Sequence, residues 1–474
     1  MADHPLTIPE VPIPYFFRAL DWEQLVHDYP PAPRFFRTTY LTSSEAIRAL
    51  QESRLPRALA HAYSVPFYRK RWDAVGVHPR DIRTLEDLRL LPTYRVDDIR
   101  RSVEEHPPFG DYQGVTPDDV QRGPLRLFTS GGTTGRPRPM FYSPWDRQVG
   151  AILRARAFYL AGFRPGDLVQ NTLLYSLHNG AFIVDEALYH WCGCIPVTTS
   201  AGLVTRSRRQ VEILREWGVR GLVGFHDFLM HLAETARELG YDPAKDFSLR
   251  AIASMGGQPR ELERVWGCNV AENYGMHEVQ VVAAECPAKA GMHLWLDAFV
   301  VEVVDLETGA PLPDGAVGSL VLTALYKTGA PVVRYDTRDT ARILSRDRCA
   351  CGSWLPRISS ILGRADTMVK LRGINVWPEA VGEIVRRDPR VGGEYFCYVE
   401  RREGRDEMVV LVERKAEVEE SATLQRDLAE QLRTQLGVTI LVEVCPPGGT
   451  QPFTRFGSES KPRRFEDRRH TRPE

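Results

Sequence analysis

The sequence predicts an α/β protein with a large N-terminal domain, in which helices flank mixed and parallel sheets, and a small C-terminal α+β domain. Helical and strand-like segments alternate between residues 150 and 260, which is typical of βαβ units with a largely parallel sheet. After Asn273, strand-like segments separated by Gly, Pro and Asp replace this alternation. The final part, of roughly 110 residues, combines a strand pair, a helix and a further strand.

The predicted helices follow from apolar spacing and from residues that begin or end a helix. Serines begin the pattern of residues 43–64, and Gly162 ends the pattern that starts at residue 146. Further helices are expected at residues 207–219, 226–240 and 421–437. Strands are expected at residues 167–175, 220–225, 249–257 and 439–445, as pairs within 299–325 and 394–414, and after a helix in 183–199. We place the domain boundary near Gly363 to Asp366, which gives domains 1–365 and 366–474.

Composition excludes several classes of protein. The 474 residues are 43% hydrophobic and 26% charged, as in globular proteins, and the net charge of −1 argues against nucleic acid as a partner. We find no apolar run long enough to span a membrane and no basic and apolar leader. Eight cysteines in a chain of this length do not predict a disulfide framework, so we expect a cytoplasmic protein with reduced thiols.

The segment LFTSGGTTGRPRPMFYS, residues 127–143, is the first candidate site. Such a loop can surround a phosphate with backbone N–H groups and hydroxyls. By itself such a loop is more often a surface turn, and it lacks the Gly-Lys-Ser/Thr ending of the common nucleotide-hydrolase loop. The candidate phosphate ligands are Ser130, Gly132, Thr133, Thr134 and Gly135.

Four later segments follow in a definite order. They are ENYGMHE (272–278), RYDTRD (334–339), GRADTMVKLRGINVWPEAVGEIV (363–385) and SKPRRFEDRR (460–469). Together with the loop, and with LLPTYRVDDIR at residues 90–100, they resemble the motifs of the adenylate-forming superfamily. The phenylacetate–CoA ligase branch of the acyl-CoA synthetases is the most similar, from about Leu55 to Arg469.

This resemblance implies ATP-dependent formation of an acyl-adenylate and its transfer to coenzyme A. Lys461 would bridge the attacking carboxylate and the α-phosphate, and Glu278 would bind Mg²⁺. Asp339 would bind the ribose, Arg364 would reach the nucleotide, and Tyr274 would stack near the adenine. The resemblance also assigns Gly257, Gly275 and Asp366 to the nucleotide site, and makes the C-terminal domain a mobile lid that turns about Asp366.

Cys286, His293, Cys349 and Cys351 supply four ligands of the kinds that a closed tetrahedral zinc site needs. Buried thiols without a metal are the alternative. Because some relatives in the resembling branch carry a Cys-His-Cys-Cys zinc site at these places, we expect structural zinc here.

Five positions depart from the family pattern: Gly131, His277, Arg338, Thr367 and Ser460. Gly131 removes a hydroxyl from the phosphate loop, and the charge of Arg138 could compensate for it. The departures concern the thiol-transfer step more than adenylation. They keep open a second reading, in which the acyl group goes to an amine or a carrier-protein thiol, and a third, a non-catalytic binding relative.

Residues 173–191 occupy the place where the aryl branch lines its acid pocket. Flat walls with a few polar groups would suit an aromatic acid, although helix capping and core packing explain the same residues equally well. The candidate acid-binding residues are Tyr175, His178, Asn179, Gly180, Phe182 and His277. The sequence thus predicts an aryl-CoA ligase that uses ATP, Mg²⁺ and CoA, and a homodimer is one assembly compatible with it.

Overall fold

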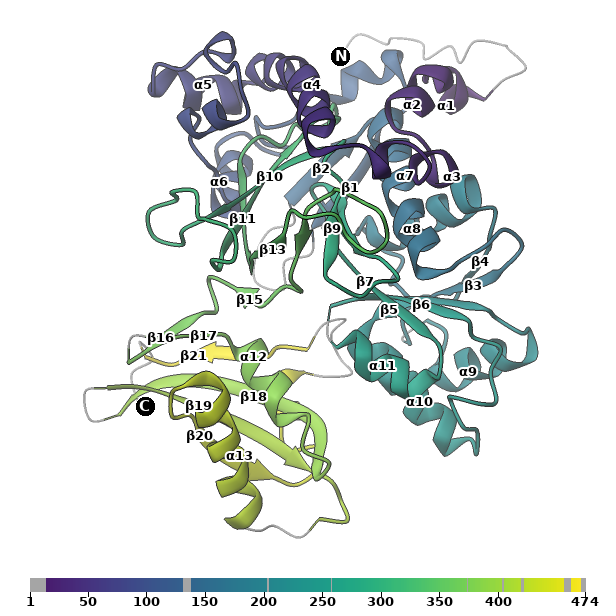
Figure 1. Ribbon diagram of the computed structural model, residues 1–474, viewed down its shortest axis with the longest axis vertical. Helices are drawn as coiled ribbons and strands as arrows, with labels where there is room; N and C mark the ends of the chain where they lie inside the picture. Colours follow the sequence, from purple (N-terminus) through teal and green to yellow (C-terminus); the bar gives the residue numbers. More distant parts are fainter. Residues whose placement is uncertain are drawn as a thin grey trace. The chain divides into compact units, whose positions relative to one another are not determined.

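The computed structural model describes residues 14–130, 138–202, 204–256, 258–372, 374–402, 405–418, 422–455 and 462–469. The chain forms two compact units (Figure 1). The first contains residues 1–337 and 342–360, and the second contains residues 338–341 and 361–474. The predicted division at residue 365 differs from these units in detail and stays a prediction.

A nine-stranded mixed sheet forms the centre of the first unit, in the order β13-β14-β9-β8-β7-β6-β5-β3-β4. Strands β3 to β7 are parallel to one another, as the alternating pattern predicts, whereas β7, β8, β9, β14 and β13 pair antiparallel. The bounds are β3 Leu168–Asn171, β4 Ile195–Thr198, β5 Gly221–Phe225, β6 Ala251–Met255, β7 Asn269–Met276, β8 Gln280–Glu285, β9 Met292–Leu294, β13 Ile343–Ser345 and β14 Arg357–Ile358.

Helices cover both faces of the parallel part of this sheet. Helix α7 (Pro144–Ala161) begins with a capping box at Ser143 and ends at Gly162, whose φ of 112° lies in the left-handed region that glycine favours. With α8 (Gly180–Glu186) it packs into one apolar core. The other helices form a second core with β5 to β7: α9 Ser207–Glu216, α10 His226–Glu238 and α11 Pro259–Trp266.

Strand β3 is the point where the strand order reverses. Asn171, its last residue, pairs with Thr198 of β4 on one side and with Val223 of β5 on the other. The chain therefore leaves β3 first toward one edge of the sheet and later toward the other. Crevices outside the carboxyl ends of strands at such a reversal are where open α/β sheets bind ligands.

The first unit also contains an N-terminal helical region, a hairpin and most of a second sheet (Figure 1). The hairpin consists of β1 (Arg126–Ser130) and β2 (Arg138–Tyr142). In the second sheet β10 (Phe299–Val304) pairs antiparallel with β11 (Gly318–Ala324), which neighbours β12 (Tyr335–Ala341). The N-terminal helices are α1 Tyr15–Arg18, α2 Trp22–Asp28, α3 Ala32–Phe35, α4 Ser44–Ser64, α5 Pro66–Ala74 and α6 Val96–Glu105.

The second unit has a sheet of four strands in the order β20-β19-β18-β21 and an apolar core of its own. The long pair β18 and β19 is antiparallel, and β20 and β21 add to it in parallel. The bounds are β15 Gly363–Arg364, β16 Val369–Leu371, β17 Ile374–Val376, α12 Pro378–Val385, β18 Val391–Arg402, β19 Arg405–Arg414, α13 Ala422–Leu436, β20 Leu441–Cys445, α14 Gln451–Thr454 and β21 Phe465–Asp467.

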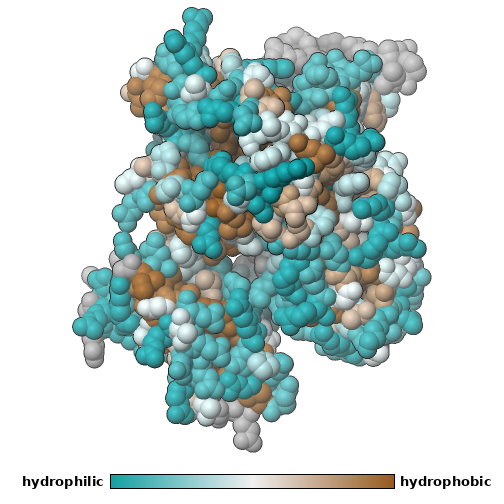
Figure 2. Space-filling view, viewed as in Figure 1, coloured by the Kyte–Doolittle hydropathy of each residue, from teal (hydrophilic) through white to brown (hydrophobic). Residues whose placement is uncertain are grey.

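Figure 2 shows one face of the surface, and this face is mostly polar. Hydrophilic side chains cover most of it, and hydrophobic residues occur in scattered groups between them (Figure 2). Among the described residues, no helix combines the length and the apolar character that crossing a membrane requires.

Candidate active site

Polar side chains gather at the carboxyl end of β3, where the strand order reverses. The Asn171 amide donates to the Tyr175 hydroxyl at 2.8 Å and to the carbonyl of Ala181 at 3.0 Å. The Tyr175 hydroxyl donates to Asp185 at 2.5 Å. The predicted acid-pocket segment is therefore tied to the strand end, and Tyr175 has an anchoring role there.

The same segment is also tied to the hairpin strand that leads into the predicted phosphate loop. The backbone N–H of Thr129 donates to the carbonyl of Leu177 at 2.8 Å. The Nδ1–H of His178 donates in turn to the carbonyl of Thr129 at 3.1 Å, which fixes the His178 tautomer. The Phe182 ring lies 5.5 Å from Phe128 on β1 and 5.2 Å from Tyr175.

The other strand of the hairpin contacts the segment that contains His277 and Glu278. The Tyr142 hydroxyl donates to the carbonyl of His277, and the two rings lie 5.8 Å apart. Burial, with help from the nearby cations Lys327 and Arg138, lowers the pKa of His277 to about 3, so its imidazole is neutral. Glu278 is buried, and Arg138 forms an ion pair with it at 3.5 Å.

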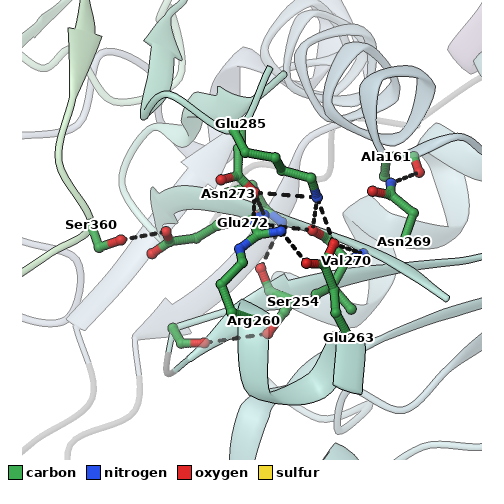
Figure 3. A network of polar contacts seen from close by, with 12 residues as sticks. Ala161, Ser254, Arg260, Glu263, Asn269, Val270, Glu272, Asn273, Glu285 and Ser360 are labelled. Atoms are coloured by element: carbon green, nitrogen blue, oxygen red, sulfur yellow. Dashed lines mark hydrogen bonds and ion pairs between the residues drawn. The ribbon is translucent and has the colours of Figure 1, made fainter. Parts of the chain in front are cut away.

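Figure 3 shows how the strand before Tyr274 is held in place. The Ser360 hydroxyl donates to Glu272 at 2.6 Å, and the Asn273 amide donates to the carbonyl of Ser254 at 3.0 Å. A Cβ atom on Gly275 would lie 2.2 Å from the carbonyl oxygen of Gln280, so only glycine fits there. These contacts fix the backbone on which Tyr274 and Glu278 stand.

In the second unit, two predicted nucleotide ligands are already paired with each other. Arg364 donates to Asp339 at 3.3 Å and to both oxygens of Asp366, at 2.9 and 3.1 Å. Asp339 and Arg364 are also cross-strand partners between β12 and β15. Arg338, at a glycine position of the resembling family, has a φ of 63°, a region that side chains rarely adopt.

The four predicted zinc ligands meet in the first unit. The ligand atoms of Cys286, His293, Cys349 and Cys351 all lie within 4.8 Å of one another. His293 donates from Nδ1 to the carbonyl of Leu355 at 2.8 Å, so the lone pair of Nε2 faces the sulfurs, 3.3 Å from Cys351. The Tyr40 hydroxyl lies 3.1 Å from Cys351. The sequence spacing alone did not guarantee this meeting, because 63 residues separate Cys286 from Cys349.

Several predicted residues lie outside the described part of the chain. They are Gly131, Gly132, Thr133, Thr134, Gly135, Gly257, Ser460 and Lys461. Ser130, the last described residue before the loop, is buried, and its hydroxyl has no hydrogen-bond partner among the described residues. Gly180 begins α8, and Asn179 precedes it as a buried residue.

The sequence analysis missed two ion pairs beside the hairpin, one fully buried and one with a buried arginine. Arg147 on α7 pairs with Glu186 on α8 at 2.5 Å, and Lys327 lies 3.6 Å from Asp146 and 3.8 Å from the centre of the Tyr142 ring. The sequence offers one indication of these pairs. Asp146 and Arg147 are charged residues in the first turn of a helix that is otherwise largely apolar and is buried along most of its length.

The comparisons with known proteins agree with the motifs. Residues 373–469 match the model of the AMP-binding enzyme C-terminal domain. The phenylacetate–coenzyme A ligase of Thermus thermophilus is 34% identical over 434 residues, which are 85% of this chain and 93% of the relative. That of Aromatoleum evansii is 32% identical over 458 residues, 93% of this chain and 98% of the relative.

Solved structures give the same result. A 2-hydroxyisobutyryl-CoA ligase in the postadenylation state, in complex with 2-HIB-AMP, is 28% identical, with a TM-score of 0.80 and coverage of 90% of this chain and 91% of that one. The same ligase with 2-HIB-AMP and CoA is 27% identical, with a TM-score of 0.64 over 91% of each chain.

Proposed function

Because the chain belongs to the phenylacetate–coenzyme A ligase family of adenylate-forming enzymes, we propose that its substrate is an aromatic carboxylic acid. The reaction class follows from the family: the enzyme is an AMP-forming acid–thiol ligase. A carboxylate oxygen attacks the α-phosphorus of ATP, and pyrophosphate leaves. The thiol of coenzyme A then attacks the acyl carbon, a proton leaves the sulfur, and AMP is released.

One observation carries the proposal: Thr129 links the acid segment to the strand that enters the phosphate loop. Its N–H and its carbonyl bind Leu177 and His178, one residue before Ser130 begins the loop. Adenylation requires the carboxylate and the α-phosphate to meet in line, and this short connection supports the proposal that the two segments bind them next to each other.

Charge neutralisation is assigned to Lys461 and Glu278. The attacking carboxylate and the triphosphate repel each other, and Lys461, which lies outside the described residues, would bridge them. Glu278 is the proposed Mg²⁺ ligand, since a buried carboxylate with one ion-pair partner at 3.5 Å retains oxygen atoms for a cation. When bound, Mg²⁺ would neutralise phosphate charge.

Several predicted residues would bind the nucleotide. Tyr274 and Gly275 would contact the base, and the phosphate loop with Gly257 would surround the phosphates. Asp339 would accept hydrogen bonds from the ribose, with Arg364 beside it at 3.3 Å. A turn of the lid about Asp366 would have to break the pair that Arg364 makes with Asp366.

An aromatic acid suits the rings around the acid segment. The Phe182 ring lies 5.5 Å from the Phe128 ring, tilted to it, and 5.2 Å from the Tyr175 ring, edge-on to it. The Tyr142 ring lies 5.7 Å from Phe128. Such rings favour a flat ligand through offset or edge-to-face contacts. The named phenylacetate ligases among the relatives support the same substrate class.

We also propose that Cys286, His293, Cys349 and Cys351 bind a structural Zn²⁺. Three sulfurs and one imidazole nitrogen that faces them form the donor set of a closed tetrahedral site. Zinc would supply a cross-link between β8, β9 and the turn before β14. Cys286 directly follows β8 and His293 lies on β9. Because β8 pairs with β9 and also with β7, the site belongs to the sheet that contains Tyr274.

The test of this function is product formation by the purified protein with ATP and Mg²⁺. The acids would be phenylacetate, benzoate, their hydroxy and amino derivatives, and 2-hydroxyisobutyrate. We expect pyrophosphate release with an aromatic acid and, once CoA is added, the matching acyl-CoA by mass spectrometry. Activation of the aliphatic acid alone would overturn the aromatic assignment and leave the ligase class in place.

Replacement of the proposed catalytic lysine gives a second test. Lys461→Ala should lower acid-dependent pyrophosphate release by about 100-fold or more, because the charge that stabilises the transition state is lost. Lys415→Ala, which changes an exposed lysine of the same unit, is the control and should keep its rate. A Lys461→Ala protein that is folded and fully active would refute the assignment.

A further inference from the structure

Arg147 is a buried cation next to the acid segment. It lies near the start of α7, directly after the hairpin, and only 3% of its surface is exposed. Its guanidinium lies 4.9 Å from the Phe128 ring and donates to Oε1 of Glu186 at 3.2 and 2.5 Å. A further N–H donates to Oδ1 of Asn179.

These contacts argue against Arg147 as a binding site for an anionic group of the ligand. Its charge is already balanced by Glu186, which accepts two hydrogen bonds from it. An anionic group of a ligand would therefore have to displace the half-buried carboxylate of Glu186 from the buried guanidinium, at a cost in desolvation. A second carboxylate on the acid is a poor match for this place.

Each partner of Arg147 retains one buried atom without a hydrogen bond among the described residues. On Asn179 that atom is Nδ2, and on Glu186 it is Oε2. Because Arg147 occupies Oδ1, the orientation of the Asn179 amide is settled, and Nδ2 is a donor that faces away from the guanidinium. The Tyr142 hydroxyl gives its hydrogen to the carbonyl of His277, and its oxygen can accept from one N–H of Asn179, so the second N–H of Nδ2 is the donor that remains.

The two atoms form a complementary pair on one side of α8. Residues 179 and 186 are seven positions apart, which places them on the same helix face, and one guanidinium bridges them. A buried polar atom without a partner costs about 1–3 kcal/mol, so a ligand that satisfies both atoms gains binding energy. The pair offers one N–H donor and one carboxylate acceptor.

A neutral hydroxyl or primary amino group fits this pair. It would donate its hydrogen to Oε2 of Glu186 and accept a hydrogen bond from Nδ2 of Asn179. The rings of Phe128 and Phe182 border the same place, with Arg147 over the face of Phe128. A ring that carries such a substituent would meet aromatic walls and the polar pair together.

We propose that Asn179 and Glu186, held by Arg147, select an aromatic acid that carries a hydroxyl or amino substituent. This selection rests on the proposed function, since it names the substrate class of the same site. Arg147 is a positioning residue in this scheme, because it orients the two side chains and does not itself reach the substituent.

The experiment compares kcat/KM for pyrophosphate release with matched acids that differ only in the substituent. We expect the wild-type protein to prefer hydroxylated or aminated acids over phenylacetate and benzoate by about tenfold or more, because a site built for a polar group rejects the analogue that lacks it. Glu186→Gln and Asn179→Asp should each lower this preference at least fivefold. Glu216→Gln, on the exposed side of α9, is the matched control and should leave it unchanged.

Two variants keep the test decisive if one fails to fold, and circular dichroism with thermal unfolding identifies such a failure. Asn179→Asp retains the oxygen that accepts from Arg147, so its fold is the safer of the two. Equal use of substituted and unsubstituted acids by the wild type would overturn the proposal while the proposed function stands. A preference that survives both variants would also overturn it. Release of pyrophosphate with none of the acids would overturn the proposed function itself.

Discussion

Single residues carry backbone strain that the family pattern would avoid. Arg338 has a φ of 63° in the segment that ends at Asp339, at a position where the family resemblance leads us to expect glycine. A side chain in the left-handed region costs about 1 kcal/mol or more, whereas glycine adopts it freely. The carbonyl of Arg338 accepts from the N–H of Ala365 at 2.6 Å, so the conformation is fixed by the neighbouring strand.

Replacement of Arg338 by glycine should therefore stabilise the protein. We expect Arg338→Gly to lower the free energy of the folded state by about 1 kcal/mol relative to Arg338→Ala, which keeps the strain but also removes the side chain. Thermal unfolding of both variants measures the difference. A glycine variant that melts no higher than the alanine variant would contradict this account.

At the scale of the element, α12 begins with a carboxylate in an unfavourable place. Glu379 lies in the first turn of the helix, and its Oε2 is buried without a hydrogen bond among the described residues. Burial raises the pKa of Glu379 above its usual value, and the carboxylates of Asp366 and Asp339 add to this. The folded state thus holds the proton of Glu379 more tightly than the unfolded chain does.

The raised pKa of Glu379 determines whether its ionisation stabilises or destabilises the folded state as the pH changes. Above the unfolded pKa of about 4.5, ionisation of Glu379 costs the folded state stability, and the loss grows as the pH rises through the raised pKa. Glu379→Gln should therefore raise the melting temperature at pH 7.5, and the gain should disappear below pH 4. Glu383→Gln, on the exposed side of the same helix, is the control, with no gain expected.

A second element-scale prediction concerns the cysteine and histidine cluster. The wild-type protein should contain about one zinc per chain, measured by mass spectrometry, since four ligand atoms lie within 4.8 Å. Cys349→Ser should lose the metal and unfold at a lower temperature. Cys268→Ser, outside the cluster, should retain it. Metal-free wild-type protein of unchanged stability would reject the site.

At the scale of the whole molecule, one buried ion pair joins distant parts of the first unit. Arg156 in the middle of α7 donates twice to Asp297, at 3.0 and 2.9 Å, and also to the carbonyl of Pro30. Both side chains are fully buried, and the guanidinium lies 3.6 Å from the Phe35 ring. The N-terminal helices, the long helix and the start of the second sheet meet there.

Removal of one partner should destabilise the unit strongly. Asp297→Asn leaves a buried guanidinium without a counter-charge, and we expect a loss of about 3 kcal/mol or more. Asp314→Asn, which breaks an exposed pair with Arg346, should cost about 1 kcal/mol or less. Urea unfolding of the two variants provides the comparison, and equal losses would refute the role of burial.

The fold was predictable where chemistry is local. The apolar spacing from residue 146, the glycine end at Gly162 and the alternating segments predicted α7 and the parallel strands, although the helix begins two residues earlier, after the Ser143 cap. Strand β21 was missed, because Arg and Asp flank its single aromatic residue and its strand character comes only from pairing with β18. The predicted strand at residues 167–175 is shorter, since the chain leaves β3 after Asn171 to form the acid segment.

The site residues that belong to ordered sequence motifs could be predicted. Those whose role depends on burial in the folded protein could not. The four metal ligands were found from residue type and resemblance, and they do meet. Arg147 and Glu186 could not be chosen, because a charged residue in a helix is normally exposed and only the folded packing shows that Arg147 is not. Tyr175 was expected as a pocket wall, but its hydroxyl is committed to Asp185.

The path of the chain between the two units has a consequence for anyone who wishes to produce them apart. Residues 338–341 belong to the second unit although residues 342–360 return to the first. A fragment that starts at residue 361 would lack residues 338–341, which pair with Gly363 and Arg364. It would therefore expose an unpaired strand edge, which favours aggregation. Dissection by simple truncation is thus the wrong strategy, and a permuted or co-expressed piece that restores those four residues is the better one.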